Sequence, residues 1–136
     1  MDSVIEKFNP PGVHEPAGYS HVTISSAGRL AHLAGQCPLD LEGNVVGEGD
    51  INAQTDQVID NCLNLLEAID CRPDDVVRSI IYVVSPDSSV LSRVWWRLNA
   101  SLLAPAFTSA STLLGVASLG YAGQLIEIDL TAALKD

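Results

Sequence analysis

The chain has 136 residues, of which 47% are hydrophobic, and its formal net charge at pH 7 is −10. This length predicts one domain, and the high apolar content predicts that some surface is buried between subunits. With 7 basic residues against 17 acidic ones, a nucleic-acid partner is not expected, because a nucleic-acid groove needs clustered lysine and arginine. No apolar run reaches the roughly 18–20 residues that span a membrane, so no membrane association is expected either.

The first part of the chain is predicted to be an irregular lead-in followed by a β-hairpin. Residues 1–17 are rich in proline and leave room for one short strand over Val4–Phe8. The runs Ser20–Ser25 and Arg29–Gln36 flank a turn that contains glycine, which predicts a hairpin. The lead-in lacks the apolar core of an export signal, so we expect a cytoplasmic protein.

The middle of the chain predicts a helix, a strand and a second helix. Apolar residues recur every three or four positions in Ile51–Asp70, and Asp50 before them is a favourable N-cap. The β-branched run Val76–Val84 is typical of a central strand that is covered on both faces. Apolar residues at helical spacing in Ser88–Leu103 predict the second helix.

Two further strands are predicted at the end of the chain, Thr108–Leu119 and Gln124–Ala133, joined around a turn at 120–123. The order hairpin, helix, strand, helix, hairpin predicts an α+β fold with one mixed β-sheet and two helices packed on one face. Two helices cover only one face, so the other face is expected to meet another subunit.

The residues alone show no metal site and no activated nucleophile. The three histidines have no helical pairing with an acid, and Cys37, Cys62 and Cys71 are not at ligand spacing. No glycine-rich phosphate loop is present. We therefore predict no metal, no cofactor and free thiols in a reducing compartment.

Four short motifs carry the functional information. They are Gly-Tyr-Ser-His at 18–21, Ala-Gly-Gln at 34–36, Ser-Ala-Ser-Thr at 109–112 and Ile-Glu-Ile-Asp at 126–129. In this order the chain resembles, over nearly its whole length, the Rid (YjgF-like) superfamily of imine and enamine deaminases. The resemblance implies a chorismate-mutase-like single domain over residues 1–136, a homotrimer, and small-molecule sites in the clefts between subunits.

The resemblance also implies roles for individual residues. Glu127 matches a glutamate that positions water and handles protons, so it is the candidate catalytic residue. The implied substrate-binding residues are Tyr19, Ala34, Gly35, Ser111, Thr112 and Trp95. Ordinary roles stay open for all of them: a solvated carboxylate for Glu127, and strand, core or interface packing for the others. Cys37 could approach the same cleft, but no basic neighbour that would activate its thiol is visible.

One position departs from the deaminase branch of this superfamily. That branch has an arginine that clamps the carboxylate of a 2-imino acid, and this chain has Ser111 there. Charge-assisted hydrogen bonds contribute roughly 1.5–3 kcal/mol each, and serine cannot replace them. Arg78 and Arg97 stay open as other sources of the charge.

We therefore expect an enzyme that hydrolyses or rearranges a larger or uncharged imine, enamine or related carbonyl compound, and that does not act as a standard 2-iminopropanoate deaminase. The alternative is a small-molecule-binding or chaperone-like trimer without turnover.

Overall fold

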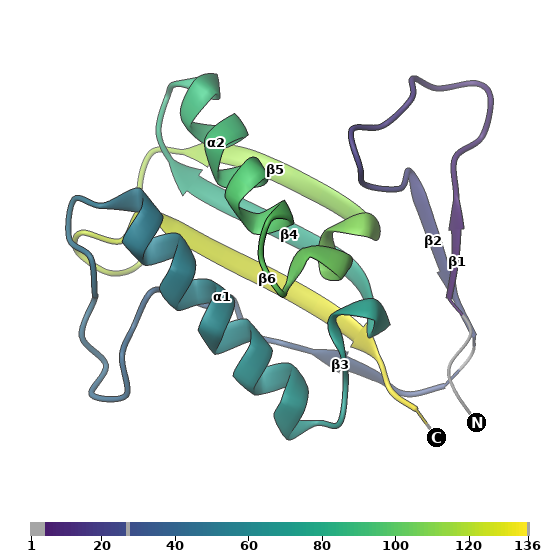
Figure 1. Cartoon of the computed structure of the whole chain (residues 1–136), viewed down its shortest axis with the longest axis horizontal. Coiled ribbons are helices and arrows are strands. Elements are labelled where there is room, and N and C mark those ends of the chain that lie inside the picture. The colour runs from purple at the N-terminus through teal and green to yellow at the C-terminus, as the bar shows by residue number, and fades with distance from the viewer. Residues whose placement is uncertain (1–4, 27, 136) are drawn as a thin grey trace.

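The computed structural model describes residues 5–26 and 28–135, whose main sheet has four strands. Their order across the sheet is β3 (Leu30–His32), β6 (Ile126–Ala133), β4 (Val76–Val84) and β5 (Ala110–Val116). β4 runs parallel to β5 and antiparallel to β6, and β3 is antiparallel to β6. The predicted mixed sheet is therefore confirmed (Figure 1).

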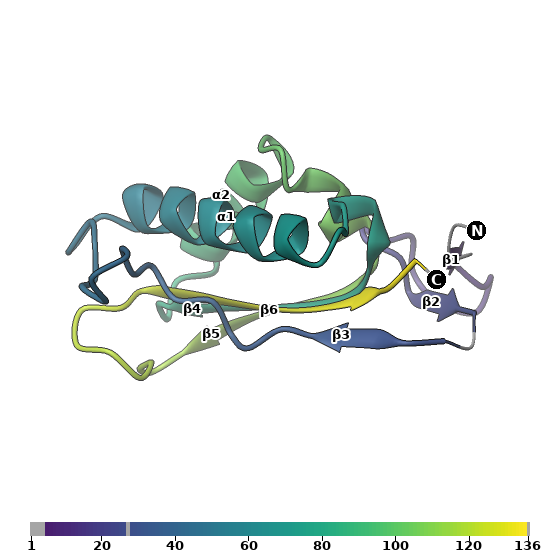
Figure 2. The ribbon, with the colours of Figure 1, turned by 90° about the horizontal axis from the view of Figure 1, so that it is seen from below.

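Both predicted helices lie on the same face of this sheet (Figure 2). Helix α1 (Ile51–Ala68) begins after Asp50, whose side chain accepts hydrogen bonds from two backbone N–H groups of the first turn. Helix α2 (Ser88–Asn99) begins after Asp87, whose side chain accepts one such hydrogen bond, from Ser89 N. These caps satisfy donors that a helix start leaves open, and they explain why the first residue of each helix was predictable.

Helix α2 ends earlier than predicted, and the following strand starts later. Predicted to reach Leu103, the helix stops at Asn99, and a short 3₁₀ helix, η2 (Ala104–Thr108), occupies the first residue of the predicted strand. Pro105 cannot continue an α-helix, but it fits the first turn of this new one. A further 3₁₀ turn, η1 (Pro73–Asp75), leads into β4.

Neither predicted hairpin forms. β2 (Val22–Ser25) pairs with β1 (Ile5–Phe8) in a separate two-stranded sheet, whereas β3 joins β6. The last two strands are not neighbours either, because β4 lies between β5 and β6. Pairing between strands that follow each other in the chain was expected, but β4 is apolar on both faces and lies in the middle of the sheet, between β5 and β6.

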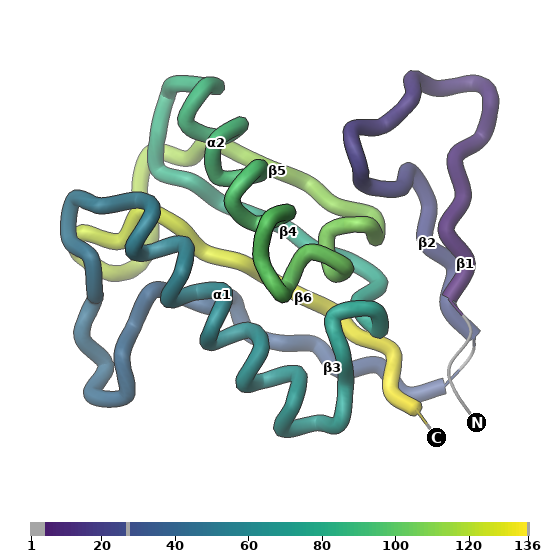
Figure 3. Tube along the Cα trace, in the orientation of Figure 1, coloured from purple at the N-terminus to yellow at the C-terminus, as the bar shows by residue number. Residues whose placement is uncertain are grey.

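The trace in Figure 3 shows the β1–β2 sheet standing at one end of the molecule, away from both helices. Backbone hydrogen bonds from the segment 20–23 tie it to the start of β5: Ser20 N donates to Ser109 O, and Ala110 N donates to the Thr23 hydroxyl. The lead-in strand predicted over Val4–Phe8 is confirmed as β1 from residue 5 on, and residue 4 lies outside the described residues.

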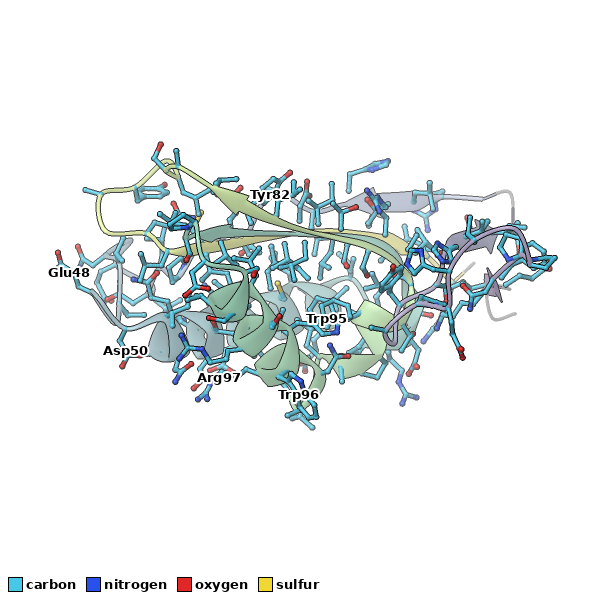
Figure 4. The ribbon with its side chains drawn as sticks, turned by 90° about the horizontal axis from the view of Figure 1, so that it is seen from above. Glu48, Asp50, Tyr82, Trp95, Trp96 and Arg97 are labelled. Atoms are coloured by element: carbon cyan, nitrogen blue, oxygen red, sulfur yellow. The ribbon has the colours of Figure 1, made fainter. Side chains whose placement is uncertain are left out.

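Side chains of β4 and β6 alternate between the two faces of the sheet. Ile81, Val83 and Ile128 are fully buried under the helices, whereas Tyr82 points away from them (Figure 4). Among the described residues, no helix covers this second face, which we call the bare face, and Leu114 on it is 42% exposed. In the described part of the chain, no helix is long and apolar enough to cross a membrane.

Candidate functional site

Three of the predicted binding residues line one pocket of about 490 Å³ beside the edge strand β5. We call it the aromatic pocket, and all its lining residues are uncharged: Ala17, Tyr19, Ser92, Trp95, Trp96, Ser111 and Leu113. They come from the loop before β2, from α2 and from β5. The fold thus brings Tyr19, Trp95 and Ser111 together from segments that are far apart in the sequence.

Trp95 connects this pocket to the core. Its ring centroid lies 6.0 Å from that of Phe107, which is fully buried, and 6.3 Å from that of Tyr19. Its indole N–H donates to Ala17 O at 3.3 Å and so fastens the lead-in loop to α2. The adjacent Trp96 is 77% exposed and points away from the sheet (Figure 4), as expected for neighbouring residues on one helix.

Tyr19 is held from the other side by the lead-in loop. Its hydroxyl lies 2.8 Å from Nε2 of His14. The His21 ring packs edge-on against both, with its Nε2 bonded to the His14 carbonyl. The Tyr19 ring is therefore fixed between the aromatic pocket and a histidine pair that the sequence analysis did not connect with it.

Ser111 faces the helix side of the sheet. Its hydroxyl accepts from Ser79, which is fully buried, at 2.6 Å and donates to Ser109 O at 3.0 Å. Neither arginine supplies a charge here: Arg97 pairs with Asp56 at 2.7 Å, and Arg78 donates to the Thr112 hydroxyl on the bare face. Within one described subunit, the aromatic pocket therefore has no carboxylate clamp.

Glu127 lies elsewhere, half-buried on the bare face. Its Oε1 accepts from the Gln124 amide at 3.1 Å and from the Cys37 thiol at 3.3 Å. The carboxyl group also lies against Gly35, where an added Cβ would stand 2.8 Å from Cδ of Glu127. Position 35 must therefore be a glycine. Two of the predicted site residues, Gly35 and Glu127, are thus in contact with each other.

The Cys37 thiol is a hydrogen-bond donor to this carboxylate. Partial burial raises its pKa to about 11, with the hydrogen bond and charge of Glu127 acting in the same direction. At neutral pH the group is therefore a thiol, and a thiolate nucleophile at this position is not supported.

A second pocket of about 530 Å³ is lined in part by Gly35 and Cys37, the two residues that contact the Glu127 carboxyl group from the loop after β3. Amide side chains of α1 and of the loop after β3 dominate its polar lining, which includes Gln36, Gln57, Asn61 and Asn64. Asn61, Gln54 and Gln124 support the site and were not predicted. The only signal for the first two was the amide spacing 54, 57, 61 and 64 along the helix, which resembles any solvated helix face. Gln124 had only its place three residues before Glu127.

Two predicted binding residues lie apart from both groups. Thr112 is on the bare face beside Arg78, and Ala34 is exposed with its carbonyl accepting from the side chain of Gln36. Ser111 and Glu127 face opposite sides of the sheet, so one subunit does not form a single cleft from all predicted residues. The described residues hold no cluster of three or more potential metal ligands.

Comparison with known proteins identifies the family. The family model described as Endoribonuclease L-PSP matches residues 12–134. The crystal structure of YyfB, a Rid family protein from Yersinia pestis described as of unknown function, has 34% identity, a TM-score of 0.86, and coverage of 98% of this chain and 100% of its own. This chain belongs to the Rid superfamily.

Two further relatives of this Rid protein are more distant in sequence or match over a shorter stretch. A RutC family protein from Pyrococcus horikoshii is 36% identical over 84 residues, which is 61% of this chain and 63% of the relative. The match thus spans less than two thirds of that protein. The structure of the yeast protein YEO7 has 26% identity and a TM-score of 0.68, covering 97% of this chain and all of its own.

Proposed function

We propose that this Rid protein is an enzyme that hydrolyses or rearranges an uncharged imine, enamine or related carbonyl compound, in clefts between the subunits of a homotrimer. One observation carries the proposal. The candidate proton-transfer group, Glu127, lies on the bare face, and the ligand-sized aromatic pocket lies on the other side of the sheet, at the open edge of β5. A cleft that uses both therefore needs two subunits, with the β5 edge of one copy meeting the bare face of the next.

The chemistry follows from the groups present. A water that gives a proton to Glu127 attacks the imine carbon, and its oxygen forms the new C–O bond. The proton then passes from the carboxyl group to the nitrogen and gives a carbinolamine. Glu127 next takes the proton of the new hydroxyl group and returns it to the nitrogen as the C=O bond forms and the C–N bond breaks, so the products are the carbonyl compound and ammonia. Trp95 and Tyr19 pack against the apolar part of the substrate, with aromatic surface as the main source of binding energy.

The uncharged lining of the aromatic pocket supports an uncharged substrate. Burying a carboxylate without a cation or a set of donors costs several kcal/mol, and the Ser111 hydroxyl already bonds to protein groups. An RNA-cleaving activity, for which the family model is named, is less well supported. The chain has 7 basic residues against 17 acidic ones, so it lacks the charge that binds phosphates.

The test is a screen of purified protein against uncharged imines, enamines and enol ethers, following ammonia and the carbonyl product. For any substrate that turns over, E127Q should lower kcat by about 10²-fold or more, because it removes the proton-transfer group and keeps its shape.

The matched control is D129N, which changes the next carboxylate on the same face of β6. D129N should keep activity within about twofold of the wild type. Wild-type activity in E127Q would contradict the catalytic role of Glu127. No turnover across the panel, with ligands still binding, would favour the binding-protein alternative.

A further inference from the structure

The two oxygens of the Glu127 carboxyl group have different surroundings. Oε1 accepts both hydrogen bonds, from the Gln124 amide at 3.1 Å and from the Cys37 thiol at 3.3 Å. No described residue donates to Oε2, which lies against the Cα position of Gly35. One oxygen is therefore held by the protein and the other is left for a ligand or water.

Gln124 is built into the protein rather than placed on its surface. Its side chain belongs to a residue that is 3% exposed, and its Nε2 donates to Ile126 O at 3.0 Å as well as to Glu127. Its Oε1 accepts from Tyr121 N at 3.1 Å. Rotating the amide by 180° would set its oxygen against two acceptors, so the hydrogen bonds determine a single orientation.

Helix α1 holds the two segments that carry Gln124 and Cys37, the donors to Glu127. Gln54, which is fully buried, donates to Gly123 O at 2.9 Å and accepts from Leu125 N at 2.7 Å. It therefore bonds to the backbone on both sides of Gln124. Asn61 donates to Cys37 O at 3.1 Å. Gln54 and Asn61 are seven residues apart, which is two helical turns, and therefore share one side of α1.

We propose that Gln124 is a positioning residue for Glu127, which together with the Cys37 thiol fixes Oε1 so that Oε2 alone exchanges the proton with water or substrate. The catalytic part of this inference rests on the proposed function, and the positioning part does not. The general reason is that a proton acceptor must be held within a fraction of an ångström of its working geometry.

The first experiment needs no substrate. The rate of Cys37 alkylation by iodoacetamide is measured against pH by peptide mass spectrometry, which separates it from the buried Cys62 and Cys71. In E127Q the profile should move to lower pH, because the charge of Glu127, which raises the pKa of the thiol, is lost. In Q124M it should also move to lower pH, because the carboxyl group is no longer held against the thiol, and Glu127 raises that pKa more than the Gln124 side chain lowers it.

The control is T55V, which removes another buried hydrogen bond of α1, from the Thr55 hydroxyl to Ile51 O, and should leave the profile unchanged. If Q124M does not fold, Q124N keeps an amide but is too short to reach Glu127. An unchanged or raised profile in the folded Gln124 variant would overturn the positioning role. An unchanged profile in E127Q would show that the thiol and the carboxylate are not in contact.

The second experiment uses any substrate found in the screen. Q124M should lower kcat about tenfold and change KM by less than about twofold, because the carboxyl position matters in the transition state and not in binding. Equal kcat in Q124M and wild type would overturn the catalytic part. If E127Q itself retains full activity, the proposed function fails, while the alkylation result still decides whether Gln124 positions the carboxylate.

Discussion

Single residues decide how the reactive groups of this protein are oriented. Gly35 lies against the Glu127 carboxyl group, and any Cβ there would come within 2.8 Å of Cδ. The Ser111 hydroxyl is hydrogen-bonded to Ser79 and to the backbone carbonyl of Ser109. Gly35 therefore determines where the Glu127 carboxylate lies, and Ser111 leaves the aromatic pocket without a charge.

Gly35→Ala should displace the Glu127 carboxyl group and lower turnover of any substrate about tenfold, because the added methyl group occupies its place. The fold should stay intact by circular dichroism. Gly12→Ala is the control, since nothing lies within 4 Å of a Cβ added there. Full activity in Gly35→Ala would mean that the carboxyl group works equally well from another position.

With 2-iminopropanoate we expect little or no hydrolysis, because Ser111 cannot hold its carboxylate. Ser111→Arg should raise the rate by about tenfold or more, since an arginine–carboxylate pair is charge-assisted and bidentate. Freshly generated imine and an assay for the oxo acid measure this. Ser92→Arg adds the same charge to the same pocket from α2 and should help less. Fast turnover by the wild type would show that a different cation serves as the clamp.

At the scale of elements, helix α1 does more than cover the sheet. Its apolar side packs in the core through Val58, Cys62 and Leu66. Its amides at 54 and 61 hold the two loops that carry the donors to Glu127. The helix thus connects the stability of the core with the geometry of the candidate site.

Gln54→Leu should lower the free energy of unfolding by about 1–3 kcal/mol, because it leaves Gly123 O and Leu125 N without their partner in a buried place. Urea denaturation followed by circular dichroism measures the change. Asn64→Leu, an exposed position on the same helix, should change it by less than about 0.5 kcal/mol. Equal effects of the two variants would show that the buried hydrogen bonds of Gln54 do not stabilise the fold.

At the scale of the whole molecule, the bare face of the sheet is the feature that one subunit leaves unexplained. It combines polar groups such as Arg78 with exposed apolar ones, among them Leu30 and Leu114 at 42% each. Apolar surface of this kind is usually buried in an assembly.

We expect sedimentation at micromolar concentration to give a homotrimer, because closed symmetry buries the same face in every copy. Leu114→Lys should weaken the assembly, since it sets a charge into the apolar contact. Leu102→Lys, after the end of α2 and 83% exposed in the subunit, should leave it unchanged. A wild-type monomer would contradict both the assembly and the intersubunit site.

The sequence by itself determined the elements that depend on local chemistry. The N-caps Asp50 and Asp87 and the apolar periodicity after them placed the starts of both helices, and the β-branched run placed β4 with its observed ends. The four motifs determined the family. These features are readable because caps, periodicity and β-branching act within a few residues of each other in the chain.

Only the tertiary structure decided which strands pair and which side chains meet. β4 separates β5 from β6 because a strand that is apolar on both faces is most stable in the middle of a sheet. The same arrangement places Ser111 and Glu127 on opposite faces of the sheet. It also places Gln124 and Cys37 so that both donate hydrogen bonds to Oε1 of Glu127. Contacts between residues 90 positions apart depend on strand order and register, and no local pattern in the sequence records either.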